Sequence, residues 1–101
     1  MIKHIVVWKL KDEANGASKL ENAKIIKQKL EALVGLIDEI KSLEVGININ
    51  EEEAFASDLC LITEFDDMQA LGRYQVNPDH KAVSGFVREV CLSRTIVDYE
   101  F

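Results

Sequence analysis

The order of its alternating and amphipathic segments constrains the fold of this chain more than any other feature. Residues 2–10, 42–50, 58–65 and 93–101 read as four strands: 42–50 alternates strictly, whereas 2–10 and 58–65 have apolar side chains at both alternating sets of positions. Helical spacing of apolar residues follows the first strand and again the third. The short connection between the second and third strands favours an antiparallel hairpin. The order β-α-β-β-α-β predicts an α+β fold of the ferredoxin-like kind, a four-stranded antiparallel sheet with helices on one face.

Capping residues predict where the helices begin and end. Ser18 and Glu21 fit a capping box, in which each residue satisfies a backbone amide of the other. We expect the first helix to end near Val34, because Gly35 is a typical C-terminal cap. After the third strand, Asp66 is the expected N-cap of the next helical segment.

The segment 75–80 reads as a joint between two helical segments. Asn77 is a good N-cap, and Pro78 at the first helical position loses no hydrogen bond there. The joint puts Tyr74 at the end of one segment and His80 in the first turn of the next. A phenol and an imidazole suit acid–base work near neutral pH, so this pair is the candidate catalytic site.

The first and third strands carry apolar residues on both faces, although helices can cover only one face of the sheet. The uncovered face needs another cover, and a second copy of the chain supplies one. We therefore expect a homodimer in which two sheets pack face to face.

Composition limits the other partners and the compartment. The 101 residues are enough for one domain, residues 1–101. A net charge of −6 argues against nucleic acid and anionic membranes. Cys60 and Cys91 show no metal or redox spacing and are expected to be buried thiols in a reducing compartment. No signal peptide or membrane span is visible, so a cytoplasmic location is expected, and no metal or cofactor is expected either.

Four stretches together resemble one known family, the stress-responsive A/B barrel (Dabb) domain. They are the opening MIKHIVVWKLKD, LEVGIN from Leu43, YQVNPDHK from Tyr74 and RTIVDYE from Arg94. The resemblance covers nearly the whole chain and implies a dimeric α+β barrel formed by two ferredoxin-like subunits. Most members of that family have no assigned role, some plant members are linked to stress, and a few are polyketide cyclases.

The resemblance also implies roles for individual residues. His80 and Tyr74 match the histidine and tyrosine that act on the substrate in the cyclases, and His4 matches the histidine of the first strand. An aldol-type cyclization needs proton removal next to a carbonyl, which suits His80 as general base, and oxyanion stabilisation, which suits Tyr74. His4 would bind the ligand or orient a partner, and Trp8 is the candidate ligand platform. The third-strand histidine of some cyclases has no counterpart in residues 58–65.

Blander interpretations compete with each of these roles. His80 can simply bond a backbone group, Tyr74 and Trp8 can be core aromatics, and His4 can be a satisfied polar group in the core. The chain would then be a non-enzymatic dimer that acts through its stability or its partners. A cofactor-free monooxygenase is a further alternative, because the same fold hosts such enzymes. An enclosed pocket in which Tyr74, His80 and His4 converge, with Trp8, Leu30 and Phe86 in its lining, would favour the ligand-binding interpretation.

Overall fold

Four long strands form one antiparallel sheet in the computed structural model, which describes residues 1–101. The strand order is β4-β5-β1-β6, where β1 is Ile2–Leu10, β4 is Ser42–Ile47, β5 is Leu59–Phe65 and β6 is Cys91–Glu100. The first and last strands of the chain are therefore neighbours, and β4 and β5 form the expected hairpin. The ferredoxin-like prediction is confirmed.

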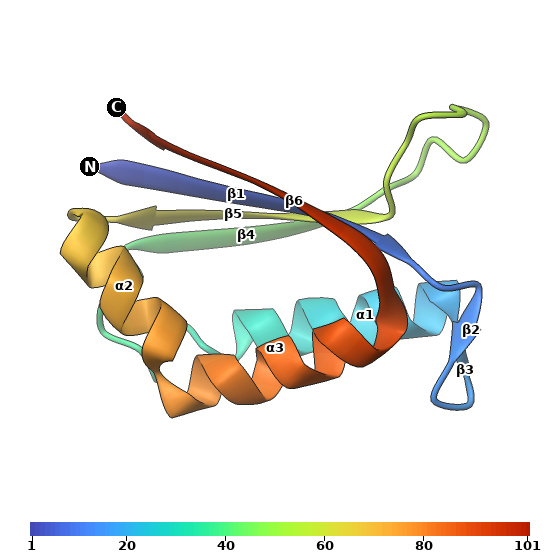
Figure 1. The fold of residues 1–101 in the computed structure, drawn as a ribbon, viewed down its shortest axis with the longest axis horizontal. Helices are drawn as coiled ribbons and strands as arrows, with labels where there is room; N and C mark the ends of the chain where they lie inside the picture. Colours follow the sequence, from blue (N-terminus) through green and yellow to red (C-terminus); the bar gives the residue numbers. More distant parts are fainter.

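Three helices cover one face of this sheet (Figure 1). They are α1 at Lys19–Glu31, α2 at Met68–Val76 and α3 at Pro78–Val90. A short hairpin of β2, Glu13–Ala14, and β3, Ala17–Ser18, leads into α1. None of the helices is both long and apolar enough to cross a lipid bilayer.

The core lies between the helices and the face of the sheet that they cover. Every second residue of β1 and β5 points into it, as strand geometry requires. Its largest apolar side chains come from both layers and include Trp8, Phe65, Leu61, Ile26, Leu30 and Tyr74. Burying an aliphatic or aromatic side chain of this size contributes about 1.5–3 kcal/mol relative to leaving it exposed. This layer fixes how α2 and α3 sit against the sheet.

The opposite face of the sheet carries the other half of the alternation, and no helix covers it (Figure 1). At its centre, Ile5 of β1 pairs with Ile62 of β5 and with Val97 of β6. Ile5 and Ile62 are half-buried, whereas the Val97 side chain is 54% exposed. The prediction that the sheet is apolar on both faces is confirmed.

Two predicted helix boundaries differ from the structure. The helix α1 ends at Glu31, three residues before Val34, and Gly35 lies in the following turn with φ +90°. The N-cap of α2 is Asp67 rather than Asp66, because the Asp67 carboxylate accepts a hydrogen bond from the Ala70 amide at 2.8 Å. Asp66 and Asp67 are equally good N-caps by residue type. The backbone conformation, which the sequence does not show, decides which of them is the cap.

The strand β4 is shorter than the predicted strand of residues 42–50. It ends at Ile47, although the alternation continues through Ile49, whose side chain is 94% exposed. The Asn48 side chain bonds the backbone of Asn50 in both directions, which turns the chain away from the sheet. Local side-chain bonding thus overrides the alternating pattern here.

Candidate functional site

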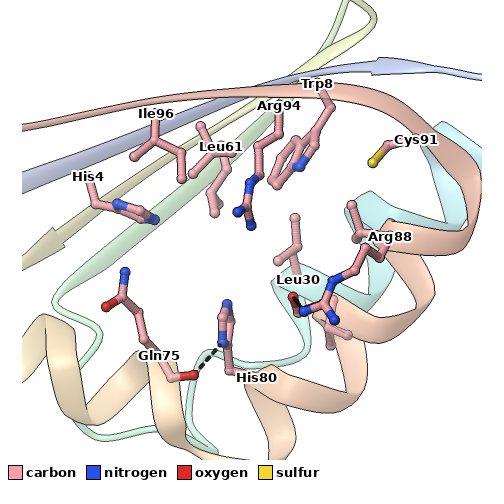
Figure 2. A pocket seen from close by; sticks show the side chains of 14 residues that line it. His4, Trp8, Leu30, Leu61, Gln75, His80, Arg88, Cys91, Arg94 and Ile96 are labelled. Atoms are coloured by element: carbon pink, nitrogen blue, oxygen red, sulfur yellow. Dashed lines mark hydrogen bonds between the residues drawn. The ribbon is translucent and has the colours of Figure 1, made fainter.

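A cavity of about 280 Å³ lies between the helix-covered face of the sheet and the helices α2 and α3. Figure 2 shows its walls, with the sheet above and the helices below. It is lined by His4, Val6, Trp8, Leu30, Leu61, Gln75, His80, Val83, Ser84, Val87, Arg88, Cys91, Arg94 and Ile96. Eight of these fourteen residues are hydrophobic, which together with a few convergent polar groups is typical of a site for a small ligand.

The joint between α2 and α3 places His80 at the floor of this cavity. The Asp79 amide donates to the Asn77 side-chain oxygen at 2.9 Å, and Pro78 occupies the first turn. The Lys81 amide donates to the Asn77 carbonyl, also at 2.9 Å. The predicted cap is therefore present, and it fixes the first turn of α3 and the direction of the His80 side chain.

The His80 ring has one nitrogen engaged and one nitrogen free. Its Nδ1 lies 3.2 Å from the carbonyl oxygen of Gln75, so Nδ1 carries the proton and donates. In the neutral ring, Nε2 is then the acceptor, and Figure 2 shows this atom pointing into the cavity. Burial lowers the pKa of His80; the bond to Gln75 opposes this effect, while the charges of His4 and Arg94 add to it. His80 is thus neutral at pH 7, with a free lone pair facing the cavity.

His4 projects from β1 into the same cavity (Figure 2). Its Nδ1 lies 2.5 Å from a carboxylate oxygen of Asp98 on the neighbouring strand β6. The residue is only 4% exposed, and the carboxylate fixes the orientation of its ring. The chain holds no group of three or more His, Cys, Asp or Glu side chains that could bind a metal ion.

Tyr74 packs against both histidines but does not line the cavity. Its ring centroid lies 4.3 Å from that of His80, 4.9 Å from Phe65 and 6.3 Å from His4. The residue is fully buried, and its hydroxyl has no hydrogen-bond partner. Burial raises the pKa of the phenol above its usual value, so the hydroxyl keeps its proton.

The expected apolar lining is present in part. Trp8 and Leu30 are walls of the cavity, whereas Phe86 is not. Phe86 lies instead beneath the Lys29 ammonium, which is 5.2 Å from its ring centroid. Cys91 is half-buried at the start of β6 and lines the cavity, so it is less enclosed than expected.

Sequence reasoning missed four polar residues of the site, Gln75, Ser84, Arg88 and Arg94. Only neutral acid–base groups near the joint were considered there, and permanently charged side chains were not. For Arg94, the alternation of residues in the last strand indicates its position, because Arg94 pairs with Trp8 and lies on the same face of the sheet as Ile96. Two-residue periodicity therefore places Arg94 above the cavity.

Comparisons with known proteins agree with this architecture. The family model of the Stress Responsive A/B Barrel Domain matches residues 2–101. A protein of Streptomyces coelicolor is 33% identical over 101 residues, which is all of both chains. A dimeric protein of unknown function with a ferredoxin-like fold, from Bacteroides fragilis, is 37% identical with a TM-score of 0.88. The alignment covers 99% of this chain and 95% of that one.

The fold is also shared with an enzyme of distant sequence. A hydroxynitrile lyase from Passiflora edulis has a TM-score of 0.81 at 14% identity, over 97% of this chain and 90% of that one. At such an identity the similarity concerns the fold alone. The family match over nearly the entire length, together with the 33% identical relative, fixes the relationship: this chain belongs to the stress-responsive A/B barrel family.

Proposed function

We propose that this protein binds a small organic molecule in the cavity and that His80 exchanges a proton with it. One observation carries the proposal: the Gln75 carbonyl holds Nδ1, which leaves the unprotonated Nε2 facing an apolar cavity. A general base needs a lone pair within reach of the substrate and a pKa below the working pH. His80 meets the second condition because burial lowers its pKa. The fitting substrate class is an aromatic or polyketide-like molecule with an acidic proton next to a carbonyl.

The other predicted residues have supporting roles in this proposal. His4, held by Asp98, would hydrogen-bond the ligand through its other ring nitrogen, from the wall opposite His80. The indole of Trp8 would form an apolar surface for the body of the ligand, beside Leu61 (Figure 2). These contacts would hold the reacting carbon near the His80 base, which is a large part of catalysis in small sites.

Tyr74 is proposed as the residue that positions the His80 ring. The two rings lie 4.3 Å apart, whereas the Tyr74 hydroxyl lies outside the cavity lining. The hydroxyl keeps its proton and has no partner. In this proposal a movement of His80 would bring it into contact with an oxyanion of the ligand, to which it would donate a hydrogen bond. Tyr74→Phe separates these two roles, because it keeps the ring and removes the donor.

The proposal includes a homodimer formed through the uncovered face of the sheet. Ile5, Val7, Ile62 and Val97 supply its apolar centre. Lys3 and Glu64, directly opposed on β1 and β5, give this face polar edges. An apolar centre with a polar rim is the usual composition of a stable interface. Neighbours of this fold are described as dimeric, which supports a dimer.

A ligand screen tests the proposal. Small aromatic and polyketide-like carbonyl compounds would be added to the wild-type protein and to His80→Gln while the melting temperature is followed. A true ligand raises the melting temperature of the wild type as its concentration increases. At a hundredfold excess over Kd, the free energy of unfolding rises by about 2.7 kcal/mol. Ligands would then be incubated in D2O, where the wild type should accelerate exchange at the carbon next to the carbonyl.

Lys81→Gln is the matched control, because Lys81 follows His80 on α3 and its side chain is exposed. It should behave as the wild type in both assays. Exchange that is equally fast in His80→Gln and the wild type would remove the assigned base. A screen in which no compound changes the melting temperature would remove the ligand-binding function.

The second candidate function is a non-enzymatic dimer, and the position of Tyr74 favours it. A tyrosine that is fully buried and packed on Phe65 can serve the core alone. On this alternative His80 bonds Gln75 only to complete the joint. The same screen decides, because this alternative predicts no ligand and no exchange.

A further inference from the structure

The cavity has positively charged walls, although the net charge of the chain is negative. The protein has 18 acidic and 12 Lys or Arg residues, and its net charge is −6. Nevertheless, no Asp or Glu lines the cavity, whereas Arg88 and Arg94 do. A cavity with positively charged walls attracts negatively charged ligands, even in a protein whose net charge is negative.

Neither arginine of the cavity has a carboxylate partner. No ion pair involves Arg88 or Arg94, and the single side-chain bond of Arg88 goes to the Ser84 hydroxyl at 3.4 Å. The third arginine of the chain, Arg73, pairs with Glu39 at 3.1 Å outside the cavity. The two cavity arginines therefore keep their planar donor sets available for a ligand.

Arg94 is the better placed of the two. Figure 2 shows its guanidinium descending from β6 beside the Trp8 indole, into the space between the sheet and His80. The free Nε2 of His80 points up into the same space. Arg88 comes from α3 and lies on the Leu30 side of the cavity. A ligand in the cavity thus meets the Arg94 guanidinium and the His80 imidazole, and apolar surface from Trp8, Leu30 and Leu61.

We propose that the ligand of this site is a carboxylate with an apolar body, and that Arg94 binds its carboxylate. This inference rests on the proposed function, since it names the class of molecule that the cavity takes. A guanidinium matches a carboxylate with two parallel hydrogen bonds, while Trp8, Leu30 and Leu61 enclose the apolar body. A cavity of about 280 Å³ suits a molecule of one or two rings. Arg88 adds the second positive charge.

Calorimetric titration with matched pairs of compounds tests this inference. Benzoate, 2-naphthoate and hexanoate would each be compared with the corresponding neutral amide, and inorganic phosphate would be a separate probe. The wild type should bind at least one carboxylate about tenfold more tightly than its amide, because a charge-assisted bond is stronger than a neutral one. Phosphate alone should bind weakly, because it has no apolar body.

Three variants locate the effect. Arg94→Gln should reduce the preference for the carboxylate over its amide to near unity while the amide still binds. Arg94→Lys should restore part of the preference, because it keeps the charge and loses the planar donor set. Arg73→Gln is the control for loss of an arginine outside the cavity and should leave the preference unchanged.

The histidine itself gives an independent readout. A carboxylate bound beside His80 should raise the pKa of the ring, which NMR titration of the labelled imidazole measures. The corresponding amide should leave this pKa unchanged.

The possible failures are distinguishable from one another. Equal binding of carboxylates and amides, or a preference that survives in Arg94→Gln, would overturn the carboxylate assignment and leave the proposed function standing. Tightest binding by inorganic phosphate would overturn it in favour of a phosphate site. If no carboxylate and no amide binds, both the assignment and the ligand-binding function fail.

Discussion

At the scale of single residues, the site depends on which atoms of three aromatic rings are engaged. Nδ1 of His80 is held by a backbone carbonyl and Nδ1 of His4 by a carboxylate, whereas the Tyr74 hydroxyl is held by nothing. The two imidazoles are therefore fixed in orientation, with their remaining nitrogens toward the cavity (Figure 2). The phenol contributes its ring to packing.

Tyr74→Phe should leave the folded protein as stable as the wild type or about 1 kcal/mol more stable. The change removes a buried hydroxyl that has no partner, and leaving such a group unpaired costs about 1–3 kcal/mol. The ring keeps its contact with His80. Urea denaturation measures the stability, and a loss above 1 kcal/mol would show that the hydroxyl has a bonding partner in solution.

The low pKa of His80 makes stability depend on pH in a defined direction. The folded state binds its proton more weakly than the unfolded chain, whose histidine titrates near 6.5. The unfolded state therefore holds more protons between the lowered pKa and pH 6.5. The contribution of His80 is complete above pH 6.5 and is lost as the pH falls toward the lowered pKa.

Denaturation curves at a series of pH values measure this effect. His80→Gln should lose less stability than the wild type between pH 6.5 and pH 5. Parallel losses in the two proteins would contradict the lowered pKa.

At the scale of elements, the joint between α2 and α3 is what the sequence predicted best. A proline and an asparagine identify the first turn of a helix through backbone chemistry alone, and the structure has the same cap. The neighbouring start of α2 was displaced by one residue, because Asp66 and Asp67 are equivalent by type. The part played by Arg94 could not be read from the joint, because strand β6 brings it there from a distant segment.

Asn77→Ala should destabilise the protein by about 1 kcal/mol, with a range of 0.5–2 kcal/mol. It should also weaken ligand binding, because the cap fixes the first turn of α3, which carries His80. Calorimetry and urea denaturation measure the two effects. The control is Asp67→Ala, which removes the cap of α2 and so should cost about the same stability without disturbing the α3 turn. Equal weakening of binding in both variants would show that general stability, and not the cap of α3, controls the site.

At the scale of the whole molecule, the two faces of the sheet differ in what covers them. One face and the helices enclose the cavity, and the other face, around Ile5, has no cover within the chain (Figure 1). The alternation of the strands was sufficient to predict this division, since a period of two residues assigns each side chain to a face. A cavity between two layers arises from distances between elements, which alternation does not encode, and so its outline came only from the structure.

Ile5→Glu should convert the proposed homodimer to a monomer. The variant places a carboxylate between Ile62 and Val97, where the proposed interface would bury it without a partner charge. Sedimentation equilibrium at micromolar concentration should give twice the chain mass for the wild type and the chain mass for the variant. Lys24→Glu, on the exposed side of α1, is the control and should remain dimeric. A monomeric wild type would contradict the face-to-face arrangement.

The protonation of the His80 ring tests the account most directly. Long-range proton–nitrogen NMR spectra of the protein labelled with 15N-histidine distinguish which ring nitrogen carries the proton. At pH 7 we expect a neutral His80 with the proton on Nδ1, and a bound ligand that perturbs Nε2. A proton on Nε2, or a positively charged ring at that pH, would contradict it.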